Sequence, residues 1–283
     1  MDQSIMLNTN AQMPLFGLGV YKISEQEADL AVGTALKEGC RLFDTAPVYK
    51  NEEWIGRALE KSVIPRSDLF ITSKIWNTAQ RMGDIEGSLT RSLERLRLTY
   101  VDLYLIHWPV PGCYLGTWKE LEKCLESGKA RAIGVSNFGI SQLDELKKVS
   151  GIVPAVNQIE VHPLCYPRKL IEYCQARNIA VQAYAPLGRG ACLDQDIVCV
   201  LATKYAKTPA QIVLRWAVQK GICVIPKSSN PARISENLDL WSFELEPSET
   251  ELLDSLNQNL HTSGIPDDLK DVLRWDDTGI ILP

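Results

Sequence analysis

The sequence predicts an α/β fold, a (β/α)8 TIM barrel with an N-terminal β-hairpin cap. Eight short apolar runs suit strands that are covered on both faces, as in a parallel sheet. Segments of helical period separate them, so the runs recur about every 30 residues, the length of one strand–helix unit. Eight such units are typical of a (β/α)8 barrel. The predicted strands are residues 15–18, 41–44, 69–74, 101–107, 130–135, 155–160, 179–185 and 222–227.

The segments between these strands carry an apolar stripe at helical spacing, which indicates helices that pack against a sheet. The pattern is clearest in residues 25–37, 84–98, 118–127 and 141–149. Ser141, and Thr208 followed by Pro209, are typical of helix starts. Glycines that directly follow helical patterns predict helix ends at Gly39, Gly128, Gly151 and Gly221.

An open, doubly wound sheet would show the same alternation of strands and helices. The sequence has no G-x-G-x-x-G after any predicted strand, and polar residues close strands all along the chain, which favours the barrel. The long last interval leaves room for an inserted segment at residues 189–206. Residues 6–7 and 13–14, separated by Asn8-Thr9-Asn10, predict the hairpin. Without any linker, residues 1–283 are interpreted as one domain, with the tail 259–283 near the substrate mouth.

Composition excludes several classes of function. The net charge of -5 gives no overall basic surface for nucleic acid. No apolar run reaches the roughly 18 residues that a membrane-spanning helix needs, and no secretory signal is visible. The eight cysteines form no C-x-x-C pair and the histidines number three, so we expect reduced thiols and no metal site. A cytoplasmic monomer is the expectation.

Three neighbouring predicted strands close with residues that carry chemistry. Asp44 ends the second strand, Lys74 the third and His107 the fourth, and Tyr49 follows Asp44 in the loop. Each alone has an ordinary structural use, as a cap, a packed ring or a solvated tip. Catalytic groups of a barrel come from the carboxyl ends of several strands, so their joint occurrence there predicts an active site.

These four side chains can deliver a proton to a carbonyl group. A tyrosine hydroxyl has an ordinary pKa near 10, and a neighbouring ammonium is expected to lower it. Asp44 would fix Lys74 and keep it charged, and His107 would orient a carbonyl oxygen by donating a hydrogen bond. None of them supplies electrons, so a cofactor is required.

A second feature follows the last predicted strand, where Lys227 and Arg233 flank small hydroxyl residues at a helix start. Free N–H groups at a helix start bind phosphate, and barrels often carry a phosphate site near strands seven and eight. Two cations suit a phosphate monoester. Taken alone, the segment is also compatible with a capped surface helix.

With these residues in place, residues 13–245 resemble the aldo-keto reductase superfamily, most closely the branch of bacterial 2,5-diketo-gluconate reductases and protozoan prostaglandin F synthases. Each motif is weak alone, whereas the ordered set at the strand ends is specific. The motifs are Gly17-Leu18-Gly19, Phe43-Asp44-Thr45-Ala46, Tyr49-Lys50-Asn51-Glu52-Glu53, Ser73-Lys74-Ile75-Trp76-Asn77, Asp102-Leu103-Tyr104-Leu105-Ile106-His107-Trp108-Pro109, Gly134-Val135-Ser136-Asn137-Phe138, Asn157-Gln158-Ile159-Glu160, Tyr184-Ala185-Pro186-Leu187-Gly188 and Ile225-Pro226-Lys227-Ser228, with Arg233, Glu236 and Asn237.

The resemblance implies an NADPH-dependent reductase of aldehydes and ketones that binds its cofactor without a Rossmann domain. It implies that Tyr49 is the general acid, that Lys74 paired to Asp44 tunes it, and that His107 orients the carbonyl. The implied cofactor residues are Gly19; Ser136, Asn137 and Gln158 at the nicotinamide carboxamide; Tyr184 stacked on the nicotinamide; Leu187 and Gly188 along the pyrophosphate; Lys227, Ser228 and Arg233 at the 2′-phosphate; and Glu236 and Asn237 at the adenine.

Substrate choice is where the resemblance says least. Tyr21 stands where many members have a tryptophan, and Trp76 and Trp108 are candidate pocket walls. The loop after His107 is short, which favours an open pocket with broad selectivity among small-molecule carbonyl substrates. The family also contains non-catalytic members, so a NADPH-binding scaffold is the alternative function. A metal-dependent hydrolase would need a ligand cluster that the sequence lacks.

Overall fold

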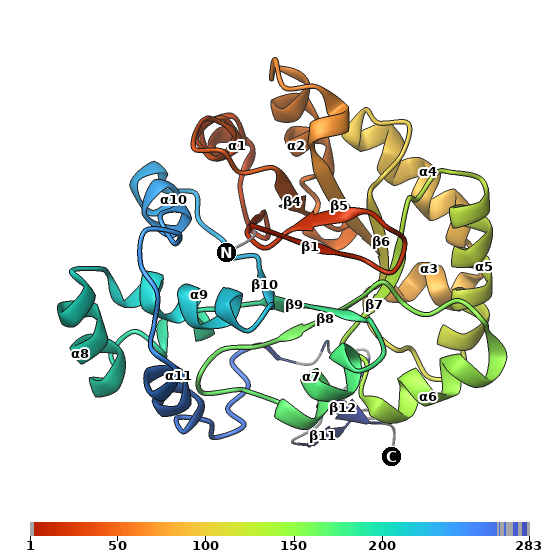
Figure 1. The fold of residues 1–283 in the computed structure, drawn as a ribbon. Helices are drawn as coiled ribbons and strands as arrows, with labels where there is room; N and C mark the ends of the chain where they lie inside the picture. Colours follow the sequence, from red (N-terminus) through yellow and green to blue (C-terminus); the bar gives the residue numbers. More distant parts are fainter. Residues whose placement is uncertain (1–2, 265, 267–268, 270–273, 277–278, 282–283) are drawn as a thin grey trace.

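Eight parallel strands form one curved sheet in the computed structural model, which describes residues 3–264, 266, 269, 274–276 and 279–281 (Figure 1). The strands follow chain order from β3 to β10. Isolated parallel bridges from Phe16 to Val224 and from Gly19 to Lys227 bring the two edges together, so the barrel nearly closes. The strands are β3 (Gly17–Gly19), β4 (Leu42–Asp44), β5 (Phe70–Ile75), β6 (Leu103–Ile106), β7 (Ile133–Ser136), β8 (Val156–Glu160), β9 (Ala180–Tyr184) and β10 (Cys223–Val224).

Each observed strand overlaps the predicted one, and the predicted order is confirmed. The largest difference lies at the last strand, where the prediction of 222–227 shrinks to Cys223–Val224. Pro226 lacks an N–H group and cannot extend the ladder by donating to it. The pairing resumes at Lys227 as a single bridge to Gly19, so the predicted phosphate segment still lies beside the first strand.

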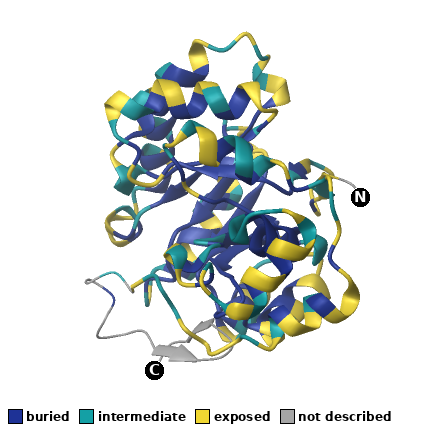
Figure 2. Ribbon diagram, turned by 90° about the vertical axis from the view of Figure 1, so that its left-hand side faces the viewer, coloured by how far each residue is buried: buried dark blue, intermediate teal, exposed yellow. Residues whose placement is uncertain are grey.

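Helices surround the sheet, with buried inner faces and exposed outer faces (Figure 2). The predicted insertion at 189–206 holds a short 3₁₀ helix and a full α-helix. The helices are α1 (Glu25–Lys37), α2 (Glu52–Glu60), α3 (Asn77–Met82), α4 (Ile85–Leu96), α5 (Tyr114–Glu126), α6 (Ile140–Val149), α7 (Arg168–Gln175), α8 (Asp196–Tyr205), α9 (Pro209–Gln219), α10 (Pro231–Leu238) and α11 (Pro247–Asp254), with the 3₁₀ helices η1 (Pro47–Tyr49), η2 (Arg66–Asp68) and η3 (Gly188–Gly190).

The caps at the helix ends follow the predictions in most places. Thr208 is the N-cap of α9, where its hydroxyl accepts from the Gln211 N–H. Ser141 is not a cap: α6 begins at Ile140, because the Gln142 side chain accepts from the Gly139 N–H and caps that position instead. Three of the predicted helix-end glycines, Gly39, Gly128 and Gly221, have positive φ, whereas α6 ends in extended backbone ahead of Gly151.

The predicted hairpin is present at the amino end of the barrel. Strand β1 (Ser4–Met6) pairs with β2 (Gln12–Pro14) in antiparallel register. The Pro14 carbonyl accepts from the Cys223 thiol at the start of β10, which ties the hairpin to the barrel. In the tail, β11 (Arg274–Asp276) and β12 (Gly279–Ile281) form a second antiparallel pair that the sequence did not predict. Within the described residues, none of the helices has both the length and the apolar character needed to cross a membrane.

Candidate active site

The residues predicted to carry chemistry meet at the carboxyl end of the barrel. Asp44 is the last residue of β4, Lys74 lies near the end of β5, and His107 directly follows β6. Tyr49 ends the short helix η1, which begins at Pro47, where the fixed φ of proline suits a helix start. Lys74 is completely buried and Asp44 is 2% exposed. The structure therefore brings the four residues together, as the sequence predicts.

Lys74 and Asp44 form a buried ion pair. The Lys74 Nζ lies 2.5 Å from Asp44 Oδ1 and donates at 3.0 Å to the Thr45 carbonyl. Burial lowers the pKa of Lys74, and the Asp44 carboxylate opposes that shift. The second Asp44 oxygen accepts from the Gln158 amide at 2.7 Å. With both oxygens satisfied, the carboxylate holds the ammonium group in one position.

Lys74 also reaches the tyrosine. Its Nζ donates to the Tyr49 hydroxyl at 3.4 Å and lies 5.1 Å from the ring centroid. The Tyr49 ring stands edge-on to His107, with centroids 5.9 Å apart, and 5.0 Å from the ring of Tyr21. Tyr49 thus has a cation beside its hydroxyl and an imidazole beside its ring.

The expectation that Lys74 lowers the pKa of Tyr49 is wrong for this structure. The pKa of Tyr49 is raised well above 10, first because burial penalises the phenolate and second because Asp44 repels it. Since Asp44 and Lys74 nearly neutralise each other, the ammonium does not outweigh desolvation. The shift favours the protonated hydroxyl of Tyr49, which lies within hydrogen-bond reach of the Lys74 ammonium.

His107 is neutral in this setting. Burial lowers its pKa well below 6.5, and the Lys74 charge adds to the shift. Its Nδ1 is buried and has no hydrogen-bond partner among the residues that the structure describes. The Asn137 amide donates to the His107 backbone carbonyl at 3.0 Å, which fixes the backbone beneath the ring. A neutral imidazole beside Tyr49 can donate one hydrogen bond to a bound oxygen without competing as an acid.

Of the residues predicted for the carboxamide, Ser136 ends β7, Asn137 directly follows it, and Gln158 lies on β8. Ser136 donates to the Gln158 carbonyl at 2.8 Å and accepts from Asn137. The Tyr184 hydroxyl donates to Asn137 Oδ1 at 2.7 Å, so its ring closes this side of the site. A short row of fixed donors and acceptors beside His107 can bind a carboxamide, which needs one donor and one acceptor.

A polar chain that the sequence did not reveal continues from this row into the barrel. The Gln158 amide donates both to Asp44 and, at 2.6 Å, to Gln182, whose own amide donates to the Cys223 thiol at 3.3 Å. Gln182 and Cys223 are completely buried. Inward-facing polar residues of strands cannot be told from outward-facing ones in a strand buried on both faces, so only the fold identifies this chain.

The predicted phosphate segment lies on the surface after β10. Lys227 and Arg233 are exposed, and Ser228 is buried beneath them. Asn230 caps α10 by accepting from the Arg233 N–H at 3.2 Å. Asn237 is buried on the same helix, and the Glu236 carboxylate accepts from Thr208 at 2.8 Å. Exposed cations beside a helix start suit a phosphate group.

The glycines predicted to contact the cofactor lie in tight backbone positions, at a close approach between two segments or in a turn. A Cβ on Gly19 would lie 2.7 Å from the Ile225 carbonyl oxygen, so a side chain there would push β3 away from the phosphate segment. Gly188 follows Leu187 in the η3 turn and has φ of +56°. The site thus offers fixed amides on and after β7 and on β8, and exposed cations after β10, where Gly19 pairs with Lys227, and these are groups that a dinucleotide can contact.

Glu27 is a charged residue of this region that the sequence argument missed. It lies on α1, and hydrogen bonds from the Ser229 and Ser24 side chains and the Ser24 N–H lower its pKa to about 2, with help from the charge of Lys227. A carboxylate therefore stands beside one of the two predicted phosphate-binding cations. Glu27 is the third residue of α1 and forms a capping box with the N-cap residue Ser24.

The substrate-side residues surround the same catalytic group. The Trp76 ring stands edge-on to His107 with centroids 5.0 Å apart, and Tyr21 is 45% exposed. Trp108 is buried in a small apolar cluster with Val110 and Leu269, and Trp76 packs against that cluster. Leu269 belongs to the tail, so one described tail residue lies at the predicted substrate wall, although much of the tail lies outside the described residues.

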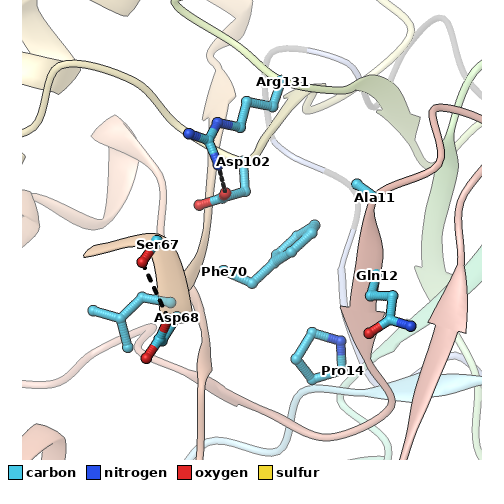
Figure 3. A pocket seen from close by; sticks show the side chains of 9 residues that line it. Ala11, Gln12, Pro14, Ser67, Asp68, Phe70, Asp102 and Arg131 are labelled. Carbon is cyan, nitrogen blue, oxygen red and sulfur yellow. Dashed lines mark hydrogen bonds and ion pairs between the residues drawn. The ribbon is translucent and has the colours of Figure 1, made fainter. Parts of the chain in front are cut away.

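A separate cavity of about 280 Å³ lies at the opposite end of the barrel, under the hairpin (Figure 3). Gln12 and Pro14 line it on one side, and Asp68 and Asp102 on the other, with Phe70 between them. None of the predicted site residues lines it. In a (β/α)8 barrel this end serves stability, so the cavity is not a second candidate active site.

Comparison with known proteins agrees with this geometry. The profile of the aldo/keto reductase family matches residues 14–258. The glyoxal reductase of Bacillus subtilis is 43% identical over 95% of this chain and 98% of its own length. The methylglyoxal reductase DkgA of Yersinia pestis is 47% identical over 88% of this chain and 91% of its own. The crystal structure of a Bombyx mori aldo-keto reductase in complex with NADP has a TM-score of 0.88 and 36% identity, covering 95% of this chain and 96% of that one.

Proposed function

Because this chain belongs to the aldo/keto reductase family, we propose that it reduces small aldehydes and ketones to alcohols with NADPH, using Tyr49 as the proton donor. Carbonyl reduction and membership of the oxidoreductases follow from the family and its named reductases. The assignment of residues and of the preferred cofactor is the proposal. The observation that carries it is the contact of a buried, paired Lys74 with the Tyr49 hydroxyl.

In this proposal each residue has one task. Ser136, Asn137 and Gln158 would hold the nicotinamide, which when bound would supply a hydride for the carbonyl carbon. His107 donates a hydrogen bond that holds the carbonyl oxygen near the Tyr49 hydroxyl. The buried imidazole ring of His107 also excludes water from that oxygen. Tyr49 gives its proton to the oxygen as the alkoxide develops. Lys74 stabilises the phenolate left behind, and Asp44 keeps the ammonium in place.

A preference for NADPH is proposed from the phosphate segment. Lys227 and Arg233 are exposed and stand at the start of α10, with Ser228 between strand and helix. NADPH differs from NADH by a 2′-phosphate that carries close to two charges, which two cations can neutralise. Glu27 reduces this advantage, because its charge acts on Lys227.

Small dicarbonyl compounds are the proposed substrate class. The relatives named glyoxal reductase and methylglyoxal reductase support it, since both cover nearly this whole chain. The exposed ring of Tyr21 leaves one side of the site open to solvent, which suits small polar substrates. We also propose, from the sequence, that residues 1–283 act as one domain and as a monomer in the cytoplasm.

The test is consumption of NADPH or NADH at matched concentration with methylglyoxal, aromatic aldehydes, sugars and keto-acids. We expect turnover of methylglyoxal with NADPH and slower turnover with NADH. Tight NADPH binding without turnover of any carbonyl would overturn the proposal in favour of a cofactor-binding scaffold. No feature of the described site favours that alternative.

A further inference from the structure

Gln182 lies on β9 and takes no part in the proposed proton transfer, yet it stands in a row of polar side chains that crosses three strands. The register pairs Gln182 with Gln158 of β8 on one side and with Cys223 of β10 on the other. Gln182 and Cys223 are completely buried, and Gln158 reaches the Asp44 carboxylate. The row therefore points into the interior of the barrel and ends at the catalytic ion pair.

The thiol of Cys223 decides which way the Gln182 amide points. A backbone carbonyl can only accept a hydrogen bond, and the Pro14 carbonyl lies 3.2 Å from the Cys223 sulfur, so the single thiol proton goes to Pro14. The sulfur can then only accept, which it does from Gln182 Nε2 at 3.3 Å. The NH₂ group of Gln182 is therefore turned to β10, and its oxygen is turned to Gln158.

The Gln182 oxygen in turn orients the amide of Gln158. Gln158 Nε2 donates to Gln182 Oε1 at 2.6 Å and to Asp44 Oδ2 at 2.7 Å, which engages both protons of that nitrogen. If the amide turned over, its oxygen would face two other oxygens and both hydrogen bonds would be lost. Two acceptors fix the plane of the amide, whereas Asp44 alone would let it swing about the remaining bond.

This arrangement leaves one polar atom of Gln158 available, the oxygen Oε1. It accepts no hydrogen bond within the described part of the chain, and it keeps some contact with solvent. Because both protons of the amide are engaged inside the barrel, Gln158 can meet a bound molecule only as an acceptor. A ligand that binds at Gln158 must therefore bring an N–H or O–H group to it.

We propose that Gln182 is a positioning residue for cofactor recognition: by fixing the amide of Gln158, it makes the site select a dinucleotide whose nicotinamide carries a carboxamide NH₂ group. The inference rests on the proposed use of a nicotinamide cofactor, with Gln158 among the residues that hold its carboxamide. An analogue without an N–H at that place leaves Gln158 Oε1 unpaired. Gln182 itself touches neither cofactor nor substrate, since it is completely buried.

The test compares the binding of NADP⁺ with that of its 3-acetylpyridine analogue, in which a methyl group replaces the carboxamide NH₂. Quenching of tryptophan fluorescence gives both dissociation constants without turnover. A site built to bind an N–H group rejects an analogue that lacks it, because the protein acceptor is left unpaired. We expect the wild type to bind the analogue about tenfold more weakly than NADP⁺.

Gln182→Met keeps the length of the side chain and removes both of its hydrogen-bonding groups. The Gln158 amide then keeps only its bond to Asp44, and its oxygen is no longer fixed. We expect the dissociation constant of NADP⁺ to rise about fivefold and that of the analogue to change less than about twofold, so that selectivity falls to about twofold. The kcat for methylglyoxal at saturating NADPH should stay within about twofold, because the ion pair of Lys74 and Asp44 is kept.

Cys223 allows a rescue test. Cys223→Ser keeps a proton for Pro14 and an acceptor for Gln182, so its selectivity should match the wild type. Cys223→Ala leaves the Gln182 NH₂ group unpaired and should lower selectivity about twofold, in the same direction as Gln182→Met. These variants also decide the question if Gln182→Met does not fold, because equal selectivity in the two would overturn the inference.

Two controls separate this role from general damage to the barrel. Gln219→Met removes an amide of the same kind, which bonds the Arg215 side chain and both backbone groups of Leu245. It should keep the wild-type selectivity, because none of these partners belongs to the row.

Glu160→Gln is the control on β8 itself. Glu160 is the last residue of that strand, two residues beyond Gln158, and its side chain is 1% exposed. Its carboxylate lies 3.1 Å from His162 Nε2 and accepts from the Thr262 N–H at 2.8 Å, so it is bound outside the row. This variant should leave the ratio of the two dissociation constants unchanged.

Three results would overturn the inference. They are an equal fall of selectivity in Gln182→Met and Gln219→Met, a wild type that binds the two dinucleotides equally, and a wild type that binds neither. A wild type that binds NADP⁺ selectively but reduces no carbonyl would overturn the proposed function instead, and the role of Gln182 would stand.

Discussion

Two aspartates lie at opposite ends of the same barrel and have different surroundings. Asp44 ends β4 at the carboxyl end, and its partner Lys74 is completely buried. Asp102 precedes β6 at the amino end, where it accepts from the Ile71 N–H at 2.9 Å and from Arg66 at 2.6 Å. Arg131, 3.9 Å away, has a side chain that is 52% exposed.

The two aspartates differ in whether the cations paired with them can reach solvent. At the amino end, Arg66 and Arg131 stack on the ring of Tyr100, with guanidinium carbons 4.0 and 3.7 Å from its centroid, and reach solvent. At the carboxyl end, Lys74 has no solvent and must stay with Asp44. A charge held in a buried, fixed position can act on a reacting group, whereas a solvated one mainly supports local structure.

Replacing the proton donor tests the carboxyl end most severely. Tyr49→Phe should lower kcat by about a thousandfold, because general acid catalysis contributes that order of magnitude and the ring packing is kept. The dissociation constant for NADPH, measured by fluorescence quenching, should stay within about twofold. Retention of a tenth of the activity would assign the proton to another group.

Exchanging each aspartate for asparagine separates the two ends directly. Asp44→Asn leaves Lys74 buried without a counter-charge, so we expect a loss of about 3 kcal/mol in unfolding free energy and a kcat reduced about a hundredfold. Asp102→Asn should lower the free energy of unfolding by about 1 kcal/mol, because Arg66 and Arg131 can be solvated by water instead. It should leave kcat unchanged. Urea unfolding and steady-state rates measure both. Equal losses of kcat would remove the distinction.

The barrel and the four residues at its strand ends could be predicted from the sequence. The hydrophobic periodicity locates the strands, and in a parallel barrel all strands have their carboxyl ends on the same side. The sequence was not sufficient for the sign of the Tyr49 pKa shift, which depends on how completely the site is buried. It also missed Gln182, because a fully buried strand shows no alternation between its faces. The contact of Leu269 with Trp108 joins distant segments that share no sequence signal.

The two ends should respond to pH with opposite signs. The folded-state pKa of Glu160 is lowered, so its contribution to stability is complete above the usual value of 4.5 and is lost as pH falls. Burial raises the pKa of Asp102 above its usual value of 3.8, so the folded state binds a proton at Asp102 more readily than the unfolded state does. The contribution of Asp102 to stability is therefore complete below pH 3.8 and is lost as the pH rises through the raised pKa.

Unfolding free energies between pH 3.5 and 7 measure this contrast. The cost of Glu160→Gln should shrink toward acidic pH, and the cost of Asp102→Asn should shrink toward neutral pH. If both costs changed in the same direction, the carboxylates would have similar environments.

Glu27 gives the smallest predicted effect and concerns the open side of the carboxyl end. Its half-buried carboxylate acts on Lys227, so it competes with a 2′-phosphate for that cation. Glu27→Gln should tighten NADPH binding by about threefold, the size of an exposed ion pair, and leave NADH binding unchanged. Glu25→Gln, on the same helix but paired with Arg57, is the control and should change neither dissociation constant.

A solvated pair is screened by salt, so the gain in NADPH affinity should fade as ionic strength rises, whereas the effect of Asp44→Asn in the buried pair should persist. A gain that resists salt would mean that the phosphate segment is enclosed, like the catalytic site, rather than open.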